Sequence, residues 1–232
     1  MRSVRAKDSR MGSVTIAALS RRVAALAVLA SIYAFAFPAA TAAQTVRIVA
    51  LGDSLTAGYG LNERDAFPVK LQAALKAKGH DVEVINAGVS GDTSSGGLAR
   101  LDWSVPEKTD AVILELGAND ALRAMDPAVT RKALDDAIGK LKSRKIEVLL
   151  AGMMAPPNFG GDYAARFNPI FPDLAKKHDV VFYPFFLDGV ASVTKLNLRD
   201  GIHPTAEGID LIVARILPKV EELIARARAN RK

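Results

Sequence analysis

The sequence predicts an α/β fold in which one parallel sheet is covered by helices on both faces. Short segments rich in Val, Ile and Leu alternate with segments of helical periodicity along most of the 232 residues. The strand-like segments are apolar throughout their length, which is typical of parallel strands that are buried on both faces. Half of the residues are apolar, so the chain can bury a sizeable core, and no linker rich in Pro, Gly or Ser divides it after the N-terminal segment.

Five strands are expected in chain order. Each is a short apolar run that ends in small or polar residues. The expected ranges are 46–51, 82–86, 111–116, 146–152 and 180–183.

Helices are expected between these strands and after the last one. The expected ranges are 66–78, 126–143, 162–178 and 205–228. Asp126 is a suitable N-cap for the second helix and Pro127 a suitable first-turn residue. Val129 is expected on the inward face of that helix. Pro218 predicts a break or bend in the last helix, because proline lacks the N–H that an interior helix position needs.

Residues 1–43 have the composition of a secretory signal peptide. Six Arg or Lys residues and a mostly apolar run, residues 23–37, precede Pro38 and the small residues 39–43. This order is typical of a cleaved leader, and the run is shorter than the roughly 20 apolar residues that a spanning helix needs. We therefore expect cleavage just before Ala43 or Gln44, a single domain over residues 44–232, and a periplasmic or secreted protein without stable membrane insertion. The alternative is an uncleaved membrane anchor.

The leader also accounts for most of the positive charge. The chain has a net charge of +6, and residues 1–43 hold six Arg or Lys and one Asp, which leaves about +1 for the rest. A nearly neutral domain gives no electrostatic argument for nucleic-acid binding. The chain has no cysteine, which excludes disulfides, cysteine zinc sites and a thiol nucleophile.

Small polar segments follow the predicted strands. They are residues 52–55, 86–93, 117–120 and, before the last helix, 200–204. In open α/β sheets, binding sites form outside the carboxyl ends of the strands. Four such segments at one sheet edge favour a hydrolytic site.

Ser54 and His203 are the candidates for a nucleophile and its base. A serine hydroxyl needs a base to remove its proton, and Asp200 lies three residues before His203, where its carboxylate can hold one ring nitrogen. His80 and His178 lie at predicted helix ends, where interaction with the helix dipole is the simpler interpretation. A capping or surface role is the alternative for His203.

Three groups can donate to an oxyanion. They are the Ser54 N–H at a helix start, the Gly91 N–H and the Asn119 side-chain NH₂. A plain turn glycine and a loop cap are the alternatives for Gly91 and Asn119.

Other chemistries are less favoured. The Gly-x-Ser-x-Gly nucleophile elbow and the glycine-rich nucleotide motifs are absent. A hard-cation site is disfavoured, because the neighbouring Gly, Ser and Asn residues are better explained by acyl transfer. The carboxylates considered for it are Asp53, Asp92, Asp120 and Asp200.

Four segments in this order carry a family resemblance. They are Gly52-Asp53-Ser54-Leu55, Ser90-Gly91-Asp92, Gly117-Ala118-Asn119-Asp120 and Asp200-Gly201-Ile202-His203-Pro204. They resemble the blocks of the SGNH (GDSL) hydrolases over nearly all of residues 44–232. Residues 51–59, 89–94 and 98–101 are similar to the bacterial acyl-CoA thioesterase I/protease I/lysophospholipase L1 group.

The resemblance implies a fold and a set of roles. The implied fold is a three-layer flavodoxin-like sandwich with a five-stranded parallel sheet in the order 2-1-3-4-5. The implied nucleophile, base and orienting acid are Ser54, His203 and Asp200, and the implied oxyanion hole is the Ser54 N–H, the Gly91 N–H and the Asn119 side chain. Ala118 replaces a glycine of the thioesterase-like block, which leaves the preference between thioester and oxyester open. The implied acyl-binding residues are Leu122, Met154, Pro157 and Phe159.

The sequence thus predicts a serine esterase that uses no metal and no cofactor. Its expected substrate is a small-molecule ester, thioester or lysolipid. A carbohydrate O-acetyl esterase or a lysophospholipase of the same fold, a non-catalytic binding module and a metal hydrolase are the alternatives. Oligomeric state is not predicted.

Overall fold

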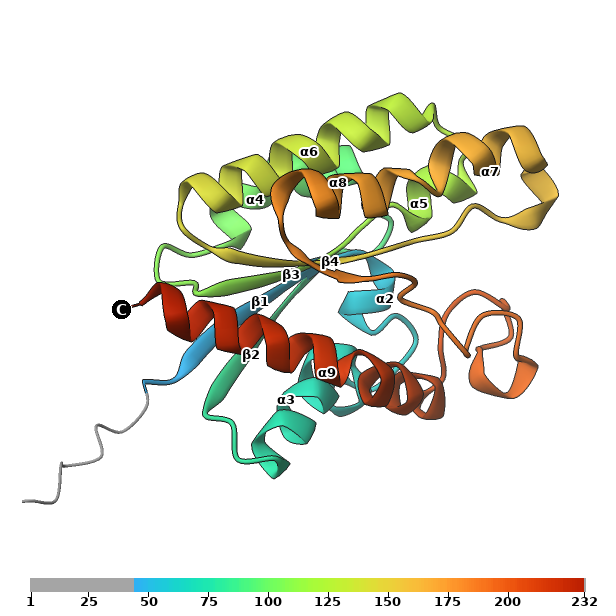
Figure 1. The fold of residues 1–232 in the computed structure, drawn as a ribbon. Helices are drawn as coiled ribbons and strands as arrows, with labels where there is room; N and C mark the ends of the chain where they lie inside the picture. Colours follow the sequence, from blue (N-terminus) through green and yellow to red (C-terminus); the bar gives the residue numbers. More distant parts are fainter. Residues whose placement is uncertain (1–43, 232) are drawn as a thin grey trace, which may run out of the picture. The chain divides into compact units, whose positions relative to one another are not determined.

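The computed structural model describes residues 44–231, and a five-stranded parallel sheet lies at the centre of this part (Figure 1). The strand order is β2-β1-β3-β4-β5, as predicted. Residues 1–43, the predicted signal peptide, lie outside the described residues, and the predicted cleavage before Ala43 or Gln44 lies at this boundary. The strands are β1 (Val46–Gly52), β2 (Val82–Gly88), β3 (Ala111–Glu115), β4 (Glu147–Ala151) and β5 (Val181–Tyr183).

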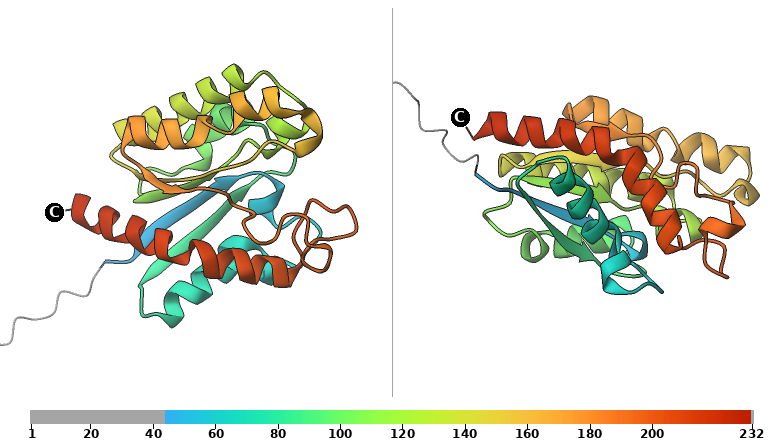
Figure 2. Two further views of the ribbon diagram at one scale, coloured as in Figure 1. Left: turned by 45° about the vertical axis from the view of Figure 1, so that its right-hand side comes forward. Right: turned by 90° about the horizontal axis from the view of Figure 1, so that it is seen from below.

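Helices cover both faces of the sheet (Figures 1 and 2). On one face α3 (Phe67–Ala77) packs against α9 (Ala206–Asn230); on the other, α6 (Pro127–Ser143) packs between α4 (Ser94–Ser104) and α8 (Ile170–His178). The short helices α2 (Ser54–Ala57), α5 (Ala118–Leu122) and α7 (Gly161–Phe167) complete the α-helices of the described part. Three short 3₁₀ turns are η1 (Glu63–Asp65), η2 (Pro157–Phe159) and η3 (Thr194–Leu196).

The apolar strand segments form the core between these layers. All five residues of β3 are buried, because strands flank it on both sides and helices cover both faces. The prediction of strands buried on both faces is wrong for β2, which is an edge strand with several partly exposed residues. None of the helices within residues 44–231 is both long and apolar enough to cross a bilayer.

The helix predictions are confirmed in part. Asp126 caps α6 through its side chain, which accepts from the Ala128 N–H at 3.1 Å. Val129 is 44% exposed, so its inward placement is wrong. It precedes the buried Leu134 by five residues, which on a helix of 3.6 residues per turn places it roughly 140° away.

Two other helices differ from their predicted ranges. The segment 162–178 forms two helices, α7 and α8, with Pro169 between them, because proline cannot continue the hydrogen-bond ladder. Helix α9 continues through Pro218, which faces solvent, and Figure 2 shows that the helix changes direction along its length rather than breaking.

Helix α4 was not predicted from the sequence. It begins with Ser-Ser-Gly-Gly, which are poor helix formers, but the Thr93 hydroxyl caps it by accepting from the Gly96 N–H at 3.2 Å. Gly97 lets the helix approach the sheet, since a Cβ there would lie 2.3 Å from Cδ1 of Leu116. Tertiary packing thus overrides a weak local propensity.

Candidate active site

A sharp turn from β1 into α2 presents Ser54 at the carboxyl edge of the sheet. The Asp53 side chain caps α2 by accepting from the Leu55 N–H at 3.0 Å. Gly52 is required at the end of β1, because a Cβ there would lie 2.1 Å from Oγ1 of Thr56 and 2.5 Å from Oε2 of Glu115. The close approach of these side chains to the backbone holds the turn in place.

The fold joins Ser54 to His203 and Asp200 in one hydrogen-bonded chain. Nε2 of His203 lies 2.9 Å from Oγ of Ser54, although 149 residues separate them in the sequence. Nδ1 of the same ring lies 2.7 Å from Oδ2 of Asp200. This is the geometry in which a base accepts the serine proton while an acid orients the ring.

The Asp200 carboxylate is held in its charged form. Its Oδ1 accepts from the backbone N–H groups of Ile202 at 3.0 Å and His203 at 3.1 Å. The Ile202 N–H, followed by the His203 side chain, lowers the pKa of Asp200 to about 2. Asp200 therefore stays ionised throughout the neutral and mildly acidic range.

Tyr59 contacts the imidazole in a way that the sequence analysis did not predict. The ring centroids of Tyr59 and His203 are 4.4 Å apart with planes tilted by 36°. The His203 side chain is 15% exposed. Tyr59 thus limits the movement of the ring on a side that neither Ser54 nor Asp200 occupies.

The predicted oxyanion donors come from two segments that follow strands: Asn119 lines the same pocket as Ser54, and Gly91 lies in the turn after β2. Asn119 is in α5, and its Nδ2 donates to Oδ2 of Asp53 at 3.1 Å. Because an amide nitrogen carries two hydrogens, this bond orients the group and uses only one of them. Gly91 has φ +87° in the turn Val89–Asp92, which the Asp92 N–H closes by donating to the Val89 carbonyl at 3.1 Å.

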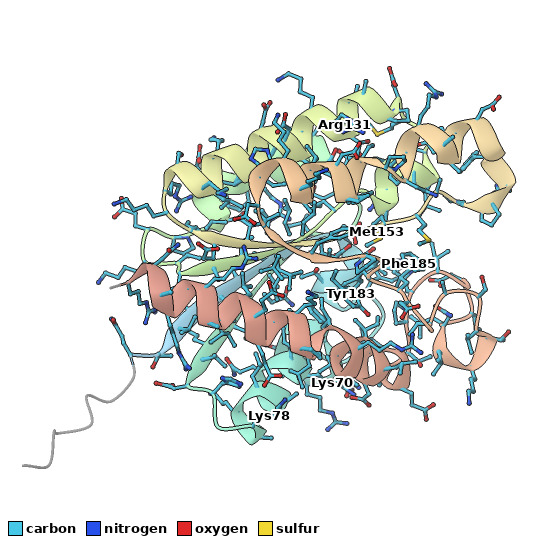
Figure 3. All side chains as sticks on the ribbon, viewed as in Figure 1. Lys70, Lys78, Arg131, Met153, Tyr183 and Phe185 are labelled. Carbon is cyan, nitrogen blue, oxygen red and sulfur yellow. The ribbon has the colours of Figure 1, made fainter. Side chains whose placement is uncertain are left out.

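An apolar pocket of about 420 Å³ opens beside Ser54 and His203. Met153 and Phe185, which both line it, lie near each other at the same end of the sheet in Figure 3. Leu122, Met154 and Pro157, which the sequence suggested as acyl-binding residues, also line the pocket. Phe159 does not line it: the ring of Phe159 packs on Tyr163 with centroids 5.8 Å apart. The sequence analysis missed the wall made by Phe185, Leu187, Ala191 and Ile202.

The other predicted acidic and histidine residues have partners of their own. Asp92 pairs with Arg100 at 2.5 Å, and Asp120 accepts from the hydroxyls of Ser94 at 2.5 Å and Thr130 at 2.9 Å. His80 contacts Glu221, and His178 contacts Asp135, both away from Ser54. These contacts assign structural roles to the histidines outside the site.

Two buried carboxyl groups lie directly behind the Ser54 turn. Asp53 and Glu115 are both fully buried, and Oε2 of Glu115 accepts from the Thr56 hydroxyl at 2.7 Å. Burial raises the pKa of Glu115 well above 4.5, and the neighbouring Asp53 charge raises it further. Burial also raises the pKa of Asp53 to about 6, against the lowering by the Leu55 N–H and Asn119. The one acidic residue in an otherwise apolar strand was the sequence signal for Glu115.

Because of this burial, Asp53→Asn is expected to gain stability relative to the wild type as pH rises. The folded wild type binds an extra proton between pH 3.8 and about 6, so its stability falls as pH rises through this window. At 1.36 kcal/mol per pKa unit, the loss is about 3 kcal/mol by pH 7.5. Urea unfolding at pH 4.0, 5.5 and 7.5 measures it, with the exposed Asp136→Asn as control. A difference between wild type and Asp53→Asn that is constant with pH would contradict the expectation.

The fold and the site define the class of protein. A doubly wound parallel sheet with a serine, histidine and aspartate joined at its carboxyl edge beside an apolar pocket is the architecture of a serine hydrolase. Residues 50–211 match the GDSL-like Lipase/Acylhydrolase family, and the chain belongs to this family. It is an SGNH-type hydrolase of esters or thioesters.

Named relatives agree with this assignment. The chain is 38% identical to Esterase TesA of Pseudomonas aeruginosa over 184 residues, which are 79% of this chain and 90% of that protein. It is 37% identical to Thioesterase 1/protease 1/lysophospholipase L1 of Escherichia coli K12 over 186 residues, 80% of this chain and 87% of that one. The crystal structure of AlinE4, an SGNH-hydrolase family esterase, matches with a TM-score of 0.66 and 44% identity, covering 77% of this chain and 96% of that one.

Proposed function

We propose that this protein is an exported esterase or thioesterase for short to medium acyl chains, with Ser54 as nucleophile, His203 as base and Asp200 as orienting acid. The observation that carries the proposal is the hydrogen-bonded chain of these residues at the mouth of an apolar pocket.

The reaction runs through an acyl-enzyme. Oγ of Ser54 attacks the carbonyl carbon while Nε2 of His203 takes its proton. The developing oxyanion accepts from the Ser54 N–H, the Gly91 N–H and the Asn119 amide. His203 then protonates the leaving alcohol or thiol. In the second half, His203 takes a proton from a water molecule while the water oxygen attacks the acyl carbon. The bond between that carbon and Oγ of Ser54 then breaks, His203 returns the proton to Oγ, and the acid is released.

The lining of the pocket favours an acyl group longer than acetyl. Most of the residues that line it are apolar, Leu122, Met154 and Pro157 among them. Burial of one methylene contributes about 0.8 kcal/mol, which corresponds to roughly fourfold in affinity. Relatives named esterase, arylesterase and thioesterase/lysophospholipase support an ester or thioester substrate.

A chain-length series of p-nitrophenyl esters tests the substrate class. We expect kcat/KM to rise several-fold per added methylene from acetate through butyrate, until the pocket is filled. The matched variant is Met154→Ser, which replaces an apolar side chain of the pocket wall with a polar one and leaves Ser54 and His203 unchanged. In this variant kcat/KM should rise less with each added methylene. A preference for acetate would instead favour the carbohydrate O-acetyl esterase.

We also propose that residues 1–43 are a signal peptide and that residues 44–232 form the exported domain. The composition of the leader supports this, and so does the position of β1, which starts at Val46. The intact mass of the exported protein tests it: a chain that begins at Ala43 or Gln44 is expected, and retention of the leader would contradict it.

A further inference from the structure

Arg100 lies buried beneath the site, although its charge would be better solvated at the surface. Arg100 is 6% exposed and belongs to α4. The guanidinium donates to four acceptors, which is most of what its five N–H groups allow. The acceptors are the carbonyls of Gly52 at 2.8 Å and Ala87 at 2.8 Å, the Ser104 hydroxyl at 3.0 Å and the Asp92 carboxylate at 2.5 Å.

One of these acceptors belongs to the strand that carries the nucleophile. The Gly52 carbonyl, at the end of β1 and two residues before Ser54, accepts from Nη2 of Arg100 and also from the Val89 N–H at 3.0 Å. The start of the Val89–Asp92 turn is therefore attached to the same carbonyl as Arg100.

The other end of that turn is attached to Arg100 as well. Nε of Arg100 donates to Oδ2 of Asp92, and the Asp92 N–H closes the turn on the Val89 carbonyl. Gly91 stands between the two attached ends. The hydrogen bonds thus form a closed ring through Gly52, Val89, Asp92 and Arg100. Gly91 lies within the turn that this ring includes, and Ser54 lies two residues after Gly52.

We propose that Arg100 is a positioning residue of the reaction, which fixes the Gly91 N–H relative to Oγ of Ser54. The inference rests on the proposed roles of Ser54 and Gly91. Catalytic groups act only when held within about 0.5 Å of their productive geometry. Without the Arg100–Asp92 bond, the buried side of the turn would be attached only through the Val89 N–H to Gly52. The exposed side would still be held by Arg123, whose Nη2 donates to the Gly91 carbonyl at 3.0 Å.

The shape of arginine matters for this role. The planar fork of the guanidinium reaches Asp92, Ala87 and Gly52 in different directions, whereas a lysine ammonium is a single point of donation. Arg100→Lys therefore keeps the buried charge but cannot hold both loops. A buried ion pair by itself is weak evidence for stability. The bonds of Arg100 to Gly52 and Asp92, one on each of the two segments beside Ser54 and Gly91, are what a positioning role needs.

The first test compares Arg100→Lys with Arg144→Lys. Arg144 also donates to backbone carbonyls, those of Val105 and Pro106, but contacts neither loop of the site. With p-nitrophenyl butyrate, we expect Arg100→Lys to lower kcat about 10- to 100-fold. The upper end of this range equals the smallest effect of removing one oxyanion donor outright. KM should stay within about twofold, because Arg100 does not line the acyl pocket. Arg144→Lys should leave both values unchanged.

A second readout separates positioning from stability. An alkyl boronic acid adds to serine as a tetrahedral adduct and so reports the oxyanion site. The affinity for the boronic acid should be lower in Arg100→Lys than in the wild type by about the same factor as kcat. The Tm of the variant should stay well above the assay temperature, so that unfolding does not explain the loss. Low concentrations of guanidinium, but not equal NaCl, should restore part of the kcat of Arg100→Ala. If Arg100→Lys does not fold, Asp92→Asn replaces it in both assays.

A folded Arg100→Lys with wild-type kcat and wild-type boronate affinity would overturn the inference. So would a loss confined to KM or to Tm. These outcomes are separate from failure of the proposed function, which Ser54→Ala tests: if that variant kept its activity, Ser54 would not be the nucleophile whatever Arg100 does.

Discussion

Ser54→Ala is expected to lower kcat for p-nitrophenyl butyrate by about 10⁴- to 10⁶-fold, because serine and histidine act as one unit in such sites. No other side chain can take the role of Oγ, since Ser54 is the serine that contacts Nε2 of His203. The hydroxyl makes no second side-chain bond among residues 44–231. Tm should therefore change little.

The matched control is Ser192→Ala, which removes a hydroxyl from another serine that lines the same pocket. Ser192→Ala should keep kcat within a few-fold and still react with a fluorophosphonate probe, whereas Ser54→Ala should not react. Labelling of Ser54→Ala at the wild-type rate, or a loss in kcat of less than tenfold, would remove Ser54 from the mechanism.

Asn119→Ala should lower kcat about 10²- to 10³-fold with little change in KM, which is the effect of removing one oxyanion donor. The amide would stabilise charge that develops only in the transition state, so the ground-state complex should be almost unaffected. The steady-state kinetics of p-nitrophenyl butyrate hydrolysis measure both values.

Asn158→Ala is the control for Asn119→Ala. It removes an exposed amide from η2, next to the pocket residue Pro157, and should have wild-type kinetics. A rise in KM with unchanged kcat in Asn119→Ala would assign Asn119 to substrate binding instead. Loss of the bond to Asp53 is monitored by Tm, since the Asp53 carboxylate would lose the donor Nδ2 of Asn119.

Local sequence patterns were sufficient for most elements of the sheet. The strand segments were recognisable because each is a continuous apolar run, and burial on both faces requires that composition. Helix α4 was missed because its first turn, Ser-Ser-Gly-Gly, has low helix propensity. The cap from Thr93 and the contact of Gly97 with Leu116 stabilise it, and the second of these depends on the folded sheet.

The parts of the candidate site that could be predicted are those whose role follows from the residue type alone. Ser54, His203 and Asp200 are recognisable from their segments, and Leu122, Met154 and Pro157 from apolar loops. Phe159 has the same apolar character but turns toward Tyr163. Composition does not specify which way a loop side chain points, because neighbouring packing decides it.

The sequence by itself determined the five strands, the long helices α3, α6 and α9 and the reactive groups at the strand ends, because apolar periodicity and residue chemistry are local properties. Only the tertiary structure decided that Arg100 joins Gly52 to Asp92, that Glu115 lies behind Asp53, and that Tyr59 packs on His203. The Gly52–Arg100 contact spans 48 residues and the Ser54–His203 contact spans 149. Contacts at such separations arise when parallel strands bring their carboxyl ends to one edge, and there burial and hydrogen bonding depend on neighbours that no local pattern specifies.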